Sequence, residues 1–293
     1  MGLSPMKWLP AAAISCALAV AWAAAQQSGE LPPGELVRQA VNNEMSADSS
    51  AGRHYMFKDE RKTEHLSQTK LIVECRDVTA GMIILQNGQP LNPQQQQAES
   101  ARLENYVRHP EELSKKQKQE KEDASRTERI LKALPDAFLY QADGTEDGTA
   151  GVGHVGDRLV RLKFRPNPAY DPPSRVEQVL TGMAGTLLVD ASEKRIAEID
   201  GTLQKDVGFG WGILGHLDRG GRFLVQQADV GGKHWEVTRM ELAFTGKILL
   251  FKKLDIRSSD IFSEFRPVPK DLSFPQAVDL LKKEAAAMAR TSP

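Results

Sequence analysis

The chain has 293 residues, with 38 basic and 39 acidic side chains and a formal net charge of −1. This balance excludes the basic excess that a nucleic-acid-binding protein carries on at least one face, so we expect no nucleic-acid partner. The hydrophobic fraction of 40% is compatible with a folded globular protein.

The N-terminus has the three parts of a secretory signal peptide. Lys7 supplies a positive charge, Trp8 to Trp22 is an almost uninterrupted apolar run, and Ala23-Ala24-Ala25 offers small residues for cleavage before Gln26. We therefore expect residues 1–25 to be removed, and the mature form, which does not span a membrane, to be periplasmic or secreted. Two alternatives stay open: a retained membrane anchor, for which the apolar run is short, and a lipoprotein modified at Cys16.

Cysteine use is minimal. Loss of Cys16 with the signal leaves Cys75 alone, so no disulfide can form within the chain. Cys75 alternates in period two with Leu71 and Val73, which predicts a buried structural thiol rather than a nucleophile.

The first half of the chain begins with a short helix and then alternates like β-strands. Asn87-Gly88 is a strong hairpin turn pair. Residues 92–134 have helical character, broken at His109-Pro110, and residues 111–133 form a charged helical insertion whose mixed signs indicate a solvated surface. The expected elements are a helix at 32–43, a polar loop at 46–52, and strands at 54–59, 69–77 and 82–85.

The second half is dense in strands. Closely spaced strands without crossover helices indicate an antiparallel sheet. Ser273 and Pro275 open a final helix. The expected strands are 138–141, 160–165, 185–190, 195–203, 222–230, 234–244 and 247–257. The fold class is therefore α+β: a large curved antiparallel β-sheet, a half-open barrel, covered by helices, in a single domain over residues 26–293.

Motifs that carry catalytic chemistry are not found. Gly151 to Gly156 matches GxGxxG, but a loop precedes it and a strand follows it, which is the wrong context for a dinucleotide site. No HExxH, GxSxG or Walker sequence occurs, and the six histidines are scattered. Asp190, Asp200 and Asp206 do not have the spacing of a calcium loop. We predict no catalytic residue, no metal ligand and no cofactor.

One segment, Val207 to Leu217, interleaves four glycines with large apolar residues. The functional interpretation is an apolar loop at the mouth of a ligand cavity. The structural interpretation is a glycine-kinked strand in a strongly curved sheet. Under the first interpretation the candidate ligand-binding residues are Phe209, Trp211, Ile213 and Leu214.

The rhythm of a known family appears in four strand segments: Gly185 to Asp190, Arg195 to Ile199, Trp235 to Val237 and Gly246 to Leu250. An export signal, an N-terminal helix and a curved antiparallel sheet resemble the LolA/LolB-like periplasmic lipoprotein-localisation-factor superfamily. The resemblance implies an unclosed barrel whose helices enclose an apolar cavity for acyl chains.

These observations favour a non-catalytic envelope protein that binds a lipid, a lipoprotein or another amphiphile in the concavity of its sheet. Two alternatives remain: a secreted hydrolase with dispersed catalytic residues, and a protein–protein interaction scaffold that recruits a partner through residues 111–133.

Overall fold

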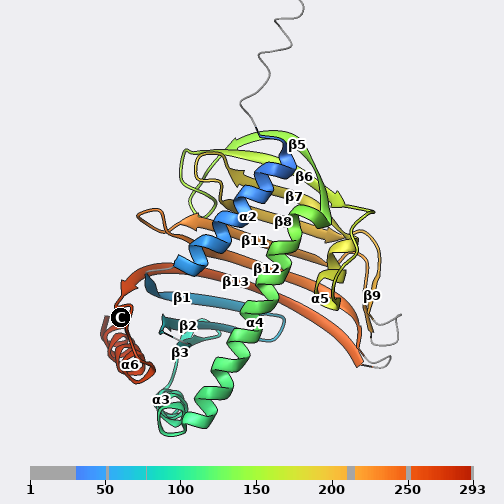
Figure 1. The fold of residues 1–293 in the computed structure, drawn as a ribbon. Helices are drawn as coiled ribbons and strands as arrows, with labels where there is room; N and C mark the ends of the chain where they lie inside the picture. Colours follow the sequence, from blue (N-terminus) through green and yellow to red (C-terminus); the bar gives the residue numbers. More distant parts are fainter. Residues whose placement is uncertain (1–30, 51–52, 77, 210–214, 249–251, 292–293) are drawn as a thin grey trace, which may run out of the picture. The chain divides into compact units, whose positions relative to one another are not determined.

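The computed structural model describes residues 31–50, 53–76, 78–209, 215–248 and 252–291, and residues 33–293 form one compact unit. Its fold is α+β, as the sequence predicted: a curved, unclosed antiparallel sheet of 13 strands with helices packed on it (Figure 1). Among the described residues, no helix is long and apolar enough to cross a membrane.

The first half supplies three helices and the strands at one edge of the sheet. Asn87 and Gly88 form the turn of the β3–β4 hairpin, and their φ angles of 53° and 75° match the turn that this residue pair favours. Asn92 and Gln95 form a capping box at the start of α3, and Pro110 opens α4. The elements are α2 (Pro33–Ser50), β1 (His54–Thr63), β2 (Ser67–Glu74), β3 (Thr79–Gln86), β4 (Gln89–Pro90), α3 (Pro93–Arg108) and α4 (Pro110–Ala137).

The second half supplies the remaining strands, two short helical turns and a C-terminal helix. Its elements are β5 (Phe138–Asp147), β6 (Arg158–Pro166), α5 (Arg175–Gln178), η1 (Val179–Gly182), β7 (Met183–Asp190), β8 (Ile196–Leu203), β9 (Val207–Phe209), β10 (Gly215–Leu217), β11 (Arg222–Asp229), β12 (Trp235–Ile248), β13 (Lys252–Val268) and α6 (Phe274–Thr291).

Two sequence predictions of element boundaries are wrong. The polar loop expected from Ser46 is helical as far as Ser50, because Met45 packs on the core and Glu44 is fixed by a buried ion pair. The strand expected at 247–257 joins the ends of two strands, β12 and β13. Their connection falls at 249–251, outside the described residues, and an uninterrupted apolar run concealed it from pattern analysis.

The sheet joins the two ends of the chain. Its strand order is β4-β3-β2-β1-β13-β12-β11-β8-β7-β6-β5, and the short β10 pairs with β12 and β9 beside this path. The N-terminal strands meet the C-terminal hairpin where β1 pairs with β13, with Arg61 opposite Asp260.

Two apolar clusters hold the helices on the sheet. In the first cluster, α2 and the C-terminal end of α4 pack on strands β5 to β8; its buried members include Val37, Leu134, Leu162 and Leu187. In the second cluster, α6 and α3 pack on β1 to β3; its buried members include Leu71, Leu103, Val278 and Leu281. The predicted charged insertion is α4, which reaches both clusters.

Candidate ligand-binding site

Helix α4 is anchored at two distant places on the sheet. Near one anchor the Glu120 carboxylate accepts hydrogen bonds from the backbone N–H and the hydroxyl of Thr79, each 2.9 Å long, at the start of β3. At the other anchor Leu134 is buried in the first cluster with strands β5 to β8. Five strands lie between β3 and β8 in the sheet order, so α4 passes across β2, β1, β13, β12 and β11 (Figure 1).

The spacing of these anchors shows which way the sheet curves. The axis of α4 covers about 21 Å from Glu120 to Leu134 at a rise of about 1.5 Å per residue. The six strand spacings from β3 to β8 amount to about 29 Å at about 4.8 Å each. A helix can join two points separated by a longer path along the sheet only if the sheet bends toward it. The face toward α4 is therefore concave.

The middle of α4 is exposed on every side. All seven residues from 121 to 127 are exposed, a length of nearly two full turns. The positions that continue the inward stripe from Glu120 to Leu131 are Ala124 and Thr127, which have small side chains. Solvent therefore reaches the side of α4 that faces the sheet, between its two anchors.

The strands that face the middle of α4 carry apolar side chains that the helices leave half-buried. Val225 lies opposite Met240 across the β11–β12 pair, and also opposite Ile199, which packs against the first core cluster. Because directly paired residues share a face, Val225 and Met240 lie on the concave face, together with Leu242 two residues further along β12. These three residues form a half-exposed apolar row under α4.

A charged pair continues this row onto β13 and β1. Asp260 lies opposite Met240 and Arg61, is fully buried, and accepts a hydrogen bond from Arg61 Nε. The Arg61 side chain is 43% exposed, so its guanidinium group is accessible beside the apolar row. Burial raises the pKa of the nearby Asp59 carboxyl, whereas Arg61 opposes the rise. The concave face thus combines an apolar row with a partly exposed arginine that is paired with Asp260.

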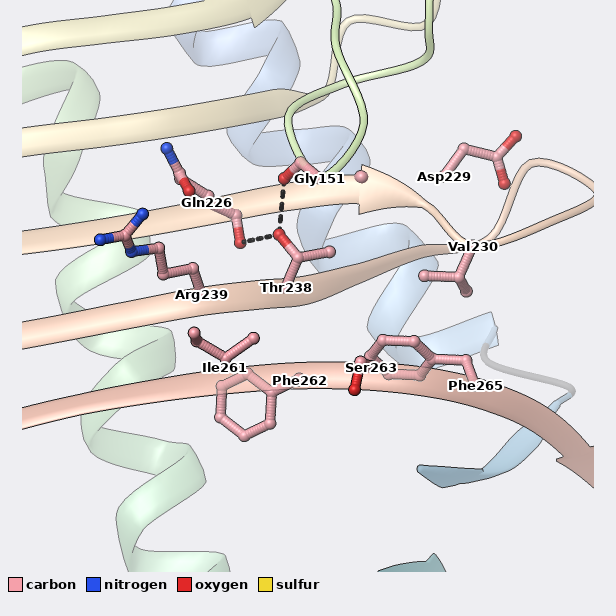
Figure 2. Close-up of a pocket in the computed structure, with 11 residues that line it drawn as sticks. Gly151, Gln226, Asp229, Val230, Thr238, Arg239, Ile261, Phe262, Ser263 and Phe265 are labelled. Atoms are coloured by element: carbon pink, nitrogen blue, oxygen red, sulfur yellow. Dashed lines mark hydrogen bonds between the residues drawn. The ribbon is translucent and has the colours of Figure 1, made fainter. Parts of the chain in front are cut away.

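A separate hollow of about 400 Å³ lies over β11, β12 and β13. In Figure 2 helices α2 and α4 lie behind these strands, so the hollow opens on the face away from the two helices. The strand register supports this placement. Gln226, Arg239 and Ile261 each follow or precede a concave-face residue in sequence, so their side chains point to the opposite face. Its lining residues are Gly151, Gln226, Ala228, Asp229, Val230, Thr238, Arg239, Ile261, Phe262, Ser263 and Phe265.

A β-bulge shapes this hollow. Arg239 pairs with Gln226 and Val237 with Gln227, which leaves Thr238 without a partner across the β11–β12 pair. The Thr238 hydroxyl donates to the carbonyl of Gly151 at 2.6 Å and holds the β5–β6 loop against the strands (Figure 2). Two other polar side chains of the lining bond to residues outside the hollow: the Asp229 carboxylate accepts from two backbone N–H groups of its own turn, and Arg239 contacts Glu241. The polar residues around the hollow therefore hold the β5–β6 loop and the β11–β12 turn in place.

The contact between His216 and Asp218 does not extend into a catalytic triad with Thr245. His216 Nε2 lies 3.2 Å from Asp218 Oδ1, but the nearby Thr245 hydroxyl donates to Asp218, at 2.6 Å, and not to the imidazole. A triad requires the hydroxyl to contact the histidine. Burial raises the pKa of the Cys75 thiol to about 11, which suppresses the nucleophilic thiolate. No cluster of three or more metal-ligating side chains occurs among the described residues.

The structure locates only one of the four predicted ligand-binding residues. Phe209 ends β9 and packs, half-buried, against the first core cluster rather than lining the hollow. Trp211, Ile213 and Leu214 lie outside the described residues. Sequence analysis missed the row of Val225, Met240 and Leu242. It located the strands that carry these residues, but a local pattern does not show which strands are neighbours in the sheet.

Comparison with protein-family models, with curated proteins and with solved structures finds no match to this chain. The resemblance to the lipoprotein-localisation-factor superfamily stays a prediction. Asp190, the last residue of the first segment that carries the resemblance, has a structural role: its Oδ1 accepts hydrogen bonds from the backbone N–H groups of Ser192 and Glu193 and from the Ser192 hydroxyl. It fixes the turn between β7 and β8.

Proposed function

We propose that the protein is an exported, non-catalytic envelope protein that binds a lipid, a lipoprotein acyl chain or another amphiphile between α4 and the concave face of its sheet. The observation that carries this proposal is the exposure of residues 121–127 on all sides of α4, opposite the half-exposed row of Val225, Met240 and Leu242. An apolar surface under a helix that does not pack on it is suited to hold an apolar ligand.

The chemistry around this row supports an amphiphile rather than a purely apolar ligand. Arg61 lies at the same face and can pair with an anionic or polar head group, while the row contacts the hydrocarbon. The hollow on the other face is a weaker candidate, because its polar groups are engaged in holding a loop and a turn.

Uptake of a fluorescent fatty acid, together with native mass spectrometry of the purified protein, tests the proposal. Ala124→Trp places a bulky ring at the inward position of α4 and is expected to reduce uptake at least about tenfold. Glu122→Trp is the matched control, because residue 122 lies on the opposite side of the helix and is exposed. Its uptake should equal that of the wild type.

Two results would overturn the proposal. One is that the wild-type protein carries no amphiphile and takes up no fatty acid. The other is that Ala124→Trp and Glu122→Trp reduce uptake equally, which would locate the binding elsewhere. Circular dichroism of both variants establishes that α4 is still folded.

A further inference from the structure

The β12–β13 hairpin extends beyond its neighbours in the sheet. The pairing of β11 with β12 ends at Arg222 and Ala243, and the pairing of β1 with β13 ends at Thr63 and Ser258. The two strands continue as a ribbon to Ile248 and Lys252, and among the described strands only the short β10 accompanies them, on the β12 side. Along Lys252 to Arg257, strand β13 is therefore an edge strand.

Three lysines gather at the end of this ribbon. Lys247 lies directly opposite Lys253, and Lys252 lies opposite Ile248. All three lysines are exposed, and the Lys253 side chain is 77% exposed. Like charges directly opposite one another on a strand pair are destabilising. Folding therefore gives no reason for the Lys247–Lys253 pair, whereas an anionic partner does.

The surrounding residues do not neutralise this charge. Asp255 lies 3.3 Å from Lys253 and 3.1 Å from Arg257, so one carboxylate is shared between two cations. Ile256 on the same edge is 39% exposed, which adds an apolar contact beside the lysines. The chain between the two strands reads Leu249-Leu250-Phe251, and these residues lie outside the described part of the chain.

We propose that Lys247, Lys252 and Lys253 dock the protein on an anionic lipid bilayer. The charge complementarity identifies the partner: a negatively charged membrane surface attracts each nearby lysine with about 1 kcal/mol, and the attraction is screened by salt. A projecting ribbon can present all three ammonium groups to one plane of head groups while the sheet stays in solution. This role is independent of the ligand bound under α4.

The test is partition of the full chain onto vesicles of phosphatidylglycerol and phosphatidylcholine, measured by co-sedimentation. The wild type is expected to bind phosphatidylglycerol vesicles and to be released by 0.5 M salt (about three times physiological ionic strength, which shortens the screening length). The triple variant Lys247→Gln, Lys252→Gln, Lys253→Gln is expected to lose about a hundredfold in partition, following the contribution of about 1 kcal/mol per lysine.

A matched control replaces three exposed lysines elsewhere, Lys205, Lys270 and Lys283, and has the same net charge as the ribbon variant. It should retain most of the wild-type binding. Equal binding to both vesicle types, or equal losses in the two triple variants, would overturn the assignment. Uptake of fatty acid by the ribbon variant should be unchanged, which separates this result from the test of ligand binding.

Discussion

The buried ion pair between Glu44 and Arg195 should be the most sensitive polar contact between α2 and the sheet. The Glu44 carboxylate accepts from Arg195 Nε at 2.8 Å, from a second guanidinium nitrogen at 2.7 Å and from the backbone N–H of Ile196 at 2.9 Å. The two side chains are only 9% and 12% exposed. Glu44→Ala leaves a buried guanidinium and a buried N–H without their acceptor, so we expect a loss of about 3–5 kcal/mol in the free energy of unfolding.

Urea unfolding followed by far-ultraviolet circular dichroism measures this loss as a lower midpoint at unchanged slope. The control is Asp200→Ala, which removes the partner of Arg222 in a pair that is 52% and 31% exposed and should cost about 0–1 kcal/mol. The double variant Glu44→Leu, Arg195→Met should recover much of the stability, because no charge remains buried. A Glu44→Ala loss no larger than that of Asp200→Ala would refute the reasoning.

Three further predictions concern single side chains. Cys75, whose thiol pKa is raised to about 11 mainly by burial, should react with a maleimide at pH 8 about a hundredfold more slowly than an unfolded control; equal rates would contradict its burial. Burial raises the pKa of Asp59 above its unfolded value near 3.8, so the folded chain binds this proton more tightly and stability falls as the pH rises through that range. Asp59→Asn should remove this loss and stabilise the protein at neutral pH, and an unchanged stability–pH curve would contradict it. Gly185→Ala places a Cβ 1.9 Å from the Asp200 carbonyl oxygen and should cost at least about 1–3 kcal/mol, whereas Gly34→Ala meets no atom within 4 Å and should be neutral.

Local patterns in the sequence were sufficient to predict the positions of most strands. In β6, Leu162 and Phe164 are buried, whereas the alternating Lys163 and Arg165 are exposed, as period two requires. The same pattern correctly predicted a buried Cys75. These features depend only on neighbouring residues, which is why a single sequence reveals them.

The concave face depends on pairings between residues far apart in the chain. Arg61 meets Asp260 across about 200 positions, and no local pattern specifies that contact. The bulge that leaves Thr238 unpaired is equally concealed, because one extra residue in a strand does not disturb the composition around it. Sequence reasoning therefore found the strands and the helix of the candidate site, but not the surface that they form together.

The pairing of β1 with β13 decides whether this surface exists. Side chains alternate between the two faces of a strand, so a slip of one residue would move Arg61 away from Asp260 and to the other face. It would also change the position of β1 to β3 relative to β12, and hence the distance between the two anchors of α4 at Thr79 and Leu134. The native register gives the buried Asp260 carboxylate the Arg61 cation, and a slip that placed Glu60 opposite it would leave an unpaired buried charge. The Arg61–Asp260 ion pair in the middle of the sheet thus favours the register that the candidate surface needs, and Asp260→Ala should reduce fatty-acid uptake even though the carboxylate itself is too buried to contact a ligand.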